Sequence, residues 1–326
     1  MNTMTEHTYV MADFDGLMGR ILEDHHPQFN ARTQHTCFVR VGEQLRFDLR
    51  KGFPGTTTKA FSMRALVGEV LGFFRGYDHA DQFEALGCRF WRKNADETPD
   101  WLASPYREGP GHLGRIYGVQ WTRWRDQRVV AFEQMQAMLD RGYRQVLTDP
   151  RAGRVLVERE INQLENVLRT LRTNPSDRRM IVSAWNVAEL DQMALPPCHM
   201  DYRFVAFPDT KELDLVMTIR SWDVFLGGPF NVAGTALILA IMARLSGFTP
   251  REIVIQATNA HLYDNHIEQT KLQLSRTPFA APTLELDIDP VASDEDIEGV
   301  FARIEPSQIR LAGYQSHEAI PAEMAA

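Results

Sequence analysis

The sequence predicts a single domain of the α+β class, in which helices and strands share one hydrophobic core. Helical and strand patterns mix along the 326 residues without a regular strand–helix–strand alternation. Hydrophobic residues make up 44% and charged residues 24% of the chain, as in an ordinary globular protein. The chain shows neither an internal repeat nor a low-complexity linker, so residues 1–326 are expected to form one unit.

The first elements are expected to be a helix, a hairpin and a second helix. Residues 13–22 carry apolar side chains at helical spacing. Residues 37–40 and 44–49 have strand patterns, and the Val41-Gly42-Glu43 segment between them is typical of a hairpin turn. A glycine- and threonine-rich loop then leads to a strongly apolar helix over residues 61–74.

A loop-rich segment interrupts these elements at about residues 92–113. Pro99, Pro105 and Pro110 break any long helix or strand there. The length of the segment indicates an insertion or a substrate-facing loop rather than core. The pattern over residues 128–155 is ambiguous.

The second half of the chain alternates between apolar helices and short strands. The expected helices cover residues 158–172 and 231–246, and the expected strands cover residues 180–185, 202–207, 213–220, 253–258 and 284–288.

Composition excludes several classes of protein. A net charge of −8 argues against a dedicated nucleic-acid-binding protein. The three cysteines are widely separated, which fits reduced thiols, and neither Cys37 nor Cys88 has metal-ligand spacing. The N-terminus lacks the apolar core of a signal peptide, and no apolar run reaches the length of a membrane span. We therefore expect a cytoplasmic protein without a metal, acting on neither membrane nor nucleic acid.

The segment from Leu195 to His199 reads Leu-Pro-Pro-Cys-His and is the strongest chemical signal. Two prolines stiffen the approach to Cys198. A thiol is strongly nucleophilic when a cation lowers its pKa, and Arg220 on the next strand-like segment is a candidate for that cation. A buried structural cysteine beside a surface histidine is the commoner outcome for such a pair taken alone.

Glu69 lies among apolar residues of the helix predicted over residues 61–74. A carboxylate in such a helix lies either at an exposed edge or in a functional site. Its apolar surroundings predict a raised pKa and an acid/base role.

Motifs distributed over nearly the whole chain resemble those of the folate-dependent thymidylate synthase superfamily. The matching blocks are Arg32-Thr33, Gly52-Phe53-Pro54, Thr57-Thr58-Lys59, residues 117–121, Asp177-Arg178-Arg179, Ala184-Trp185-Asn186, residues 193–199, Arg220-Ser221, Asp223, Leu226-Gly227, Pro229-Phe230-Asn231, residues 261–263, Asn265-His266 and Gly313-Tyr314. The resemblance implies a large mixed β-sheet flanked by helices, with one sheet face packed against a second copy in an obligate homodimer.

The resemblance also implies covalent chemistry on a pyrimidine ring. A thiolate that adds to carbon 6 of uracil converts the ring into an enolate, whose carbon 5 attacks an electrophile. Cys198 matches the nucleophile, and Glu69 the acid/base that works through water, with His199 and Tyr117 in the same network. Asn231 matches the base-reading residue, because an amide offers one donor and one acceptor to uracil.

The remaining site residues are likewise assigned by the resemblance. A pyrimidine nucleoside monophosphate, with dUMP favoured, is expected to contact Arg32, Arg220 and Ser221 at its phosphate, His261 and Tyr263 at its sugar, and Asn231 and Asp223 elsewhere, with Arg178 and Arg179 contributed across the dimer interface. The co-substrate 5,10-methylenetetrahydrofolate is expected to contact Trp91, Asp223, Leu226, Gly227, Phe230 and Lys59.

The sequence departs from the family pattern in four places. Arg203 stands where the family has glutamine, Thr258-Asn259 replaces Gly-Asp, and Gln34-His35 replaces glycines. The last residues, 323–326, lack the usual proline and terminal valine.

The altered tail decides which product the sequence favours. A tail that excludes water permits hydride transfer and a methyl product, whereas entry of water gives a hydroxymethyl group. We therefore expect 5-hydroxymethylation of dUMP, with reductive methylation to dTMP as the alternative and a CMP or dCMP hydroxymethylase as a weaker one. A non-enzymatic RNA-binding regulator on the same fold would not need Cys198.

Overall fold

A computed structural model describes residues 9–324 of the chain, so the residues before Tyr9 and the terminal Ala325 and Ala326 lie outside the described part. The helices are α1 (Ala12–Glu23), α2 (Met63–Phe74), α3 (Ala80–Ala85), α4 (Arg92–Glu97), α5 (Pro99–Leu102), α6 (Tyr117–Thr122), α7 (Met135–Leu139), α8 (Gln163–Thr173), α9 (Gly228–Ser246) and α10 (Ile267–Leu274). The strands are β1 (His26–Asn30), β2 (His35–Asp48), β3 (Trp124–Ala131), β4 (Arg144–Asp149), β5 (Arg154–Ile161), β6 (Ile181–Ser183), β7 (His199–Phe207), β8 (Glu212–Ile219), β9 (Trp222–Asp223), β10 (Thr249–Tyr263), β11 (Thr283–Leu286) and β12 (Ile309–Ala312).

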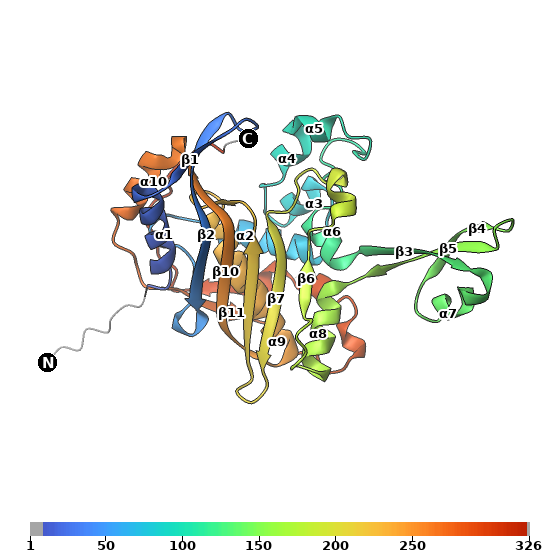
Figure 1. The fold of residues 1–326 in the computed structure, drawn as a ribbon. Helices are drawn as coiled ribbons and strands as arrows, with labels where there is room; N and C mark the ends of the chain where they lie inside the picture. Colours follow the sequence, from blue (N-terminus) through green and yellow to red (C-terminus); the bar gives the residue numbers. More distant parts are fainter. Residues whose placement is uncertain (1–8, 325–326) are drawn as a thin grey trace.

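One large sheet organises the molecule (Figure 1). Its strands run in the order β1-β2-β10-β8-β7-β6, and β9 also pairs with β10. The pairs of β10 with β8 and β9 are parallel and the other neighbours are antiparallel, so the sheet is mixed. Together with its helices, this sheet confirms the predicted α+β class.

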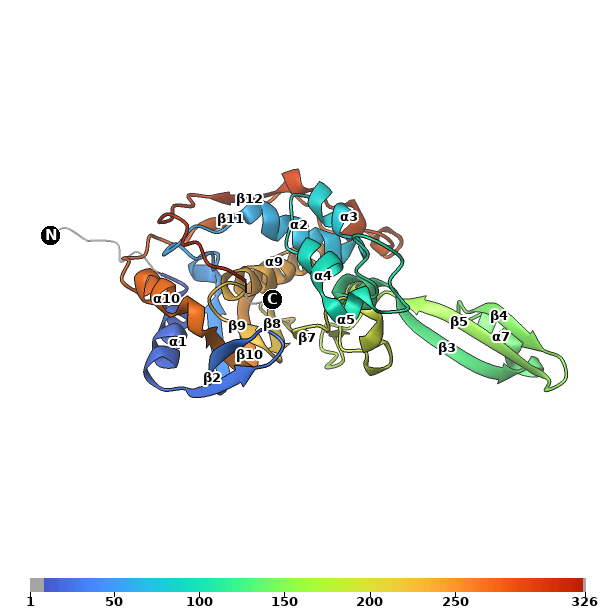
Figure 2. The same ribbon diagram turned by 90° about the horizontal axis from the view of Figure 1, so that it is seen from above.

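Helix α9 is the centre of the core. It packs with α2 on one side of the sheet (Figure 2), and Ala236, Leu237 and Leu239 are fully buried. Its 19 residues have the length and mean hydropathy of a membrane span, but 83% of that stretch is buried inside the protein. Burial in the protein core therefore accounts for the apolar composition of α9.

The other face of the sheet keeps exposed side chains. In β7, Tyr202 and Phe204 are buried toward the helices, whereas Arg203 and Val205 point the other way and are exposed. Ile181 of the neighbouring β6 is also exposed, at 44%. This alternation follows from the two-residue period of a strand.

A second, three-stranded sheet projects from the body of the protein (Figures 1 and 2). Its order is β3-β5-β4, and it has a small core of its own made of Met138, Tyr143, Val155 and Val157. It occupies the region whose pattern was ambiguous. Residues 158–161 belong to β5, so the helix predicted from 158 was extended too far; Asn162 caps α8 and marks its true beginning.

Two further predictions need correction. The hairpin at Val41-Gly42-Glu43 does not form, because β10 is long enough to pair with β2 on both sides of that segment. The stretch at residues 92–113 contains the short helices α4 and α5, and Pro99 separates them as the first residue of α5. Trp101 is buried there, so part of this segment is packed core.

Candidate active site

Cys198 lies directly before β7, where the chain enters the sheet. Its backbone N–H donates to the Tyr117 hydroxyl at 2.6 Å. The Arg220 guanidinium donates to the carbonyls of Pro196 and Pro197 at 2.9 and 2.8 Å, and the Arg220 backbone N–H donates to the Cys198 carbonyl. One arginine thus fixes the whole Pro-Pro-Cys turn.

The electrostatics of the thiol differ from the expectation. Burial is the largest influence and raises the pKa of Cys198, while Arg220 and then Arg32 act against it. The predicted arginine is therefore in place, but its field does not outweigh burial in the isolated chain.

Glu69 is joined to Cys198 by a chain of aromatic side chains. The Trp91 indole N–H donates to Glu69 Oε1 at 3.1 Å, and the Trp91 ring packs edge-on against Tyr117, 5.6 Å between centroids. Burial raises the pKa of Glu69 to about 7, and the Trp91 hydrogen bond opposes that rise. A carboxyl group with this pKa both accepts and returns a proton near neutrality.

His199 follows Cys198 and points into the same group of side chains. Its Nδ1 is 2.9 Å from the Tyr202 hydroxyl, and its ring packs edge-on against Tyr117. Burial lowers the pKa of His199 to about 4, with a hydrogen bond to the Asn231 side chain acting in the other direction. The imidazole is therefore neutral at physiological pH and serves as a hydrogen-bonding group.

Asn231 lies in the first turn of α9, and Gly227 precedes that helix. A Cβ atom at Gly227 would come within 3.3 Å of Asn231 Oδ1 and crowd the amide. Asp223 stabilises the turn that precedes α9, because its Oδ1 accepts hydrogen bonds from the backbone N–H groups of Phe225 and Leu226. Glycine at position 227 therefore leaves room for the Asn231 amide, whose base-reading role stays a prediction.

His261 and Tyr263 are two residues apart on one face of β10, the face of Cys37 and Val39 and not that of the core residues Ala260 and Leu262. Their rings meet edge-on at 5.0 Å, and both are buried. Asp223 is the register partner of His261 across β9. Burial raises the pKa of Tyr263 to about 12. Both residues therefore present neutral polar atoms.

Arg32 lies on the exposed turn between β1 and β2. Gln34 in that turn has a φ of 56°, a conformation that favours glycine. His35 Nδ1 contacts Asp264 Oδ1 at 2.7 Å, and Asp264 also accepts the Thr36 N–H. Of the two side chains that replace the family glycines, His35 ties this turn to the segment after Tyr263, whereas Gln34 donates to the Ala31 carbonyl within the turn.

Arg178 and Arg179 are not part of this chain's own cysteine site. They precede Ile181, which pairs with Arg203, about five residues along β7 from Cys198. At ~3.3 Å per residue this register position is already roughly 16 Å from the thiol, and the two arginines come before it. Both are exposed, and Arg179 is ion-paired with Asp177.

Comparison with known proteins identifies the family. The thymidylate synthase family model matches residues 12–326. The thymidylate synthases of Bordetella parapertussis and Pseudomonas syringae pv. tomato are 42% and 39% identical to the chain over 294 and 298 residues, and each match covers 87% of this chain and 90% of the relative. The chain belongs to the thymidylate synthase family. It is therefore a folate-dependent one-carbon transferase with 5,10-methylenetetrahydrofolate as co-substrate, as predicted.

The side chains expected to form an apolar wall for the co-substrate differ in their exposure. Trp91 is 5% exposed and packed among Phe73, Phe83 and Tyr117, so it orients Glu69 rather than facing solvent. Leu226 and Phe230 keep exposed surface and remain candidates for the thymidylate synthase folate site.

Two aromatic residues that the sequence did not single out pack against Phe230. Phe90 is 38% exposed and packs on Phe230 at 4.8 Å, while Phe61 supports Phe230 at 5.8 Å. Of the Phe90-Trp91 pair, Phe90 is the more exposed member, and the folate contact of Trp91 stays a prediction.

Lys59 is buried within the chain. Its ammonium donates to the Phe225 carbonyl and lies 3.5 Å from the centre of the Phe225 ring. Burial lowers the pKa of Lys59 to about 8, with Asp223 and Asp15 opposing the change. The structure thus gives Lys59 a contact that supports the turn before α9, and its folate role stays a prediction.

Arg203 is remote from the thiol chemistry. It lies on the open sheet face, where it pairs with Asp201 at 2.9 Å, and Asp201 also accepts from Thr218. No group of three His, Cys, Asp or Glu side chains able to hold a metal occurs among residues 9–324.

The segment after β12 runs back over the molecule toward β9 (Figure 2). It is attached by the Tyr314 hydroxyl to the Thr56 carbonyl and by Arg276 to the Glu318 carbonyl. Farther on, His266 Nε2 donates to the Glu323 carbonyl at 2.7 Å. The tail is therefore anchored along its described length.

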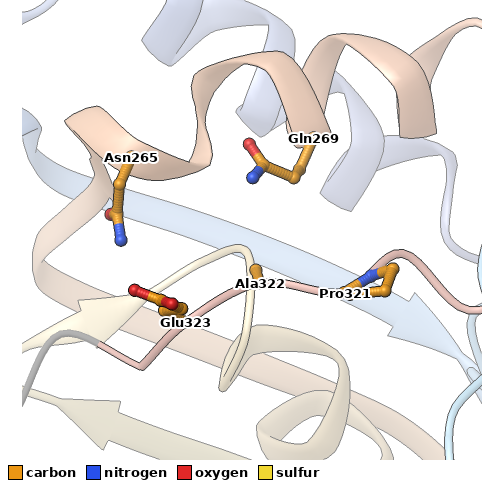
Figure 3. Close-up of a pocket in the computed structure, with 5 residues that line it drawn as sticks. All are labelled: Asn265, Gln269, Pro321, Ala322 and Glu323. Carbon is orange, nitrogen blue, oxygen red and sulfur yellow. The ribbon is translucent and has the colours of Figure 1, made fainter.

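A cavity of about 430 Å³ lies beside the tail. Figure 3 shows Glu323 facing Asn265, with Gln269, Pro321 and Ala322 around the same space. Amide and carboxylate groups make this cavity suitable for water.

Proposed function

We propose that the chain transfers a one-carbon unit from 5,10-methylenetetrahydrofolate to carbon 5 of dUMP and reduces it to a methyl group, giving dTMP and dihydrofolate. The observation that carries the choice of product is the anchored tail, which favours exclusion of water from the reacting methylene. The relatives named thymidylate synthase support the same product.

The residues supply the covalent and proton-transfer steps. Cys198 loses its proton as its sulfur bonds to carbon 6, and carbon 5 then attacks the methylene carbon of the co-substrate. Glu69, through water, takes the proton from carbon 5 as tetrahydrofolate leaves. Hydride transfer from tetrahydrofolate then forms the methyl group, and the carbon–sulfur bond breaks.

Reading of uracil rests on Asn231. As an amide beside neutral His199, it offers a donor to the carbonyl oxygen on carbon 4 and an acceptor to N3–H. Asn231→Asp is expected to shift preference toward dCMP, and competition between dUMP and dCMP measures it. Unchanged preference would refute the assignment.

Hydroxymethylation of dUMP is the second candidate, favoured by a specific observation. The polar cavity beside Glu323 offers water a place next to the tail, where the family usually has proline. A hydroxymethylase releases tetrahydrofolate, so it produces no dihydrofolate.

The two products are separated by one incubation with dUMP and methylenetetrahydrofolate. Stoichiometric rise of dihydrofolate absorbance, with dTMP identified by mass spectrometry, supports methylation. Hydroxymethyl-dUMP without dihydrofolate would overturn it. The matched variant Glu323→Pro should leave a methyl product unchanged and lower any hydroxymethyl fraction.

We also propose a homodimer that works in the cytoplasm, where the three free thiols of residues 9–324 stay reduced. The open sheet face with Ile181 and Val205 supplies the contact, and Arg178 and Arg179 reach the other subunit's phosphate site. Mixing Cys198→Ala and Arg178→Ala subunits should restore activity of one site per dimer. No recovery would refute shared sites.

A further inference from the structure

A row of polar side chains leads from the protein surface to His261. The His261 Nδ1 atom lies 2.8 Å from Asn259 Oδ1, and Asn259 Nδ2 lies 3.4 Å from Gln28 Oε1. Asn259 and His261 share a face of β10 because they are two residues apart, and Gln28 belongs to the outer strand β1.

The amide of Asn259 fixes which ring nitrogen carries the proton. An amide oxygen only accepts, so the atom facing it must be Nδ1–H. Gln28 uses the Asn259 NH2 group and leaves the oxygen for the imidazole. A neutral ring with Nδ1–H then has a bare lone pair on Nε2.

The surroundings of His261 keep the ring neutral. Burial is the largest influence and lowers the pKa of His261, as does His266 from the segment after β10. Asp223 on β9 and the hydrogen bond to Asn259 act the other way. Asparagine at position 259 adds no charge, whereas the aspartate usual in the family would favour an imidazolium.

We propose that Gln28 and Asn259 are positioning residues that hold His261 as its Nδ1–H tautomer, so that Nε2 accepts a hydrogen bond from a sugar hydroxyl of the nucleotide. This inference rests on the proposed function for the identity of the nucleotide. The site then requires a donor at the sugar 3′ position and disfavours a group that only accepts.

The tautomer is measured directly by 15N NMR of histidine-labelled, full-length protein without nucleotide. The wild type should show a protonated Nδ1 and an unprotonated Nε2 at His261. Asn259→Asp should shift the ring toward the doubly protonated form near neutral pH, and Gln28→Leu should produce a mixture of tautomers. A wild-type ring protonated at Nε2 alone would overturn the inference.

The consequence for recognition is measured by calorimetric binding of dUMP and its 3′-fluoro analogue. Loss of one hydrogen bond to a buried acceptor should weaken binding of the analogue by about 10- to 100-fold in the wild type. Asn259→Asp makes Nε2 a donor. In this variant the ratio of the Kd for the 3′-fluoro analogue to the Kd for dUMP should fall toward one. Gln127→Leu removes a similar exposed glutamine hydrogen bond on the projecting sheet and should leave the ratio unchanged.

An unchanged ratio in both Asn259→Asp and Gln28→Leu would overturn the inference while leaving the proposed function intact. Absence of dUMP binding by the wild type would instead refute the proposed function, and with it the sugar contact. The two failures are therefore distinguishable.

Discussion

Replacement of Trp91 by phenylalanine tests the link between the aromatic cluster and proton transfer. The indole N–H is the one described donor to Glu69, at 3.1 Å, and it opposes the rise in pKa caused by burial. Phenylalanine keeps the ring packing against Tyr117 but removes that donor. The pKa of Glu69 should therefore rise above its value of about 7.

The size of the shift follows from the strength of the bond. A hydrogen bond to a charged group contributes about 1.5–3 kcal/mol, and one pKa unit corresponds to about 1.4 kcal/mol. The limb of the pH–rate profile that reports Glu69 should therefore move by about 1 to 2 units toward alkaline pH in Trp91→Phe.

The assay is the pH dependence of kcat with saturating dUMP and methylenetetrahydrofolate. Trp101→Phe is the matched control, because Trp101 is equally buried and its indole N–H donates to the His112 carbonyl, away from Glu69. A limb that stays in place or moves to acid pH in Trp91→Phe would refute the reasoning. So would an equal shift in Trp101→Phe.

Three other predictions concern the nucleophile, the buried carboxyl group and the glycines. Cys198→Ala should abolish turnover but retain dUMP binding in calorimetry, and loss of both would mean that the thiol also supports the fold. Because the pKa of Glu69 is raised to about 7, the folded state binds this proton more tightly than the unfolded chain, so the free energy of unfolding should fall as pH rises from the ordinary carboxyl range through about 7. Urea denaturation across that range should show this fall in the free energy of unfolding for the wild type but not for Glu69→Gln. An equal pH dependence of the unfolding free energy in the two proteins would contradict the prediction. Gly118→Ala places a Cβ 2.4 Å from backbone of α2 and should cost about 1–3 kcal/mol, whereas Gly19→Ala in α1 meets nothing within 4 Å and should add about 0.5–1 kcal/mol, both by thermal unfolding.

Local patterns located the longer helices and several strands of the large sheet, and they failed where a strand depends on a distant partner. The spacing of Leu164, Val167, Leu168 and Leu171 identifies α8, because one buried stripe explains all four. No such stripe distinguishes β5 from the start of that helix, since β5 owes its form to pairing with β3 and β4. The false hairpin has the same cause, because the true partner of β2 lies far along the chain.

In the candidate site, too, features carried by neighbouring residues could be predicted, whereas features created by contacts between distant elements could not. The Pro-Pro-Cys-His segment could be found because its residues are neighbours in sequence. The raised pKa of Cys198 could not, since burial and the distance to Arg220 are set only by the fold. Phe90 and Gln28 were missed because each acquires its role from a partner on another element, Phe230 and Asn259.

The pairing of β2 with β10 also bears on how the protein is made. Asp48 and Thr249 are separated by roughly 200 residues, which a ribosome adds in about 10–40 s at 5–20 residues per second. Throughout that interval β2 lacks its inner neighbour β10, and once β8 has been made it lacks its parallel partner as well. Edges of this kind recruit other strands, so molecular chaperones are expected to matter most before Tyr263 has emerged.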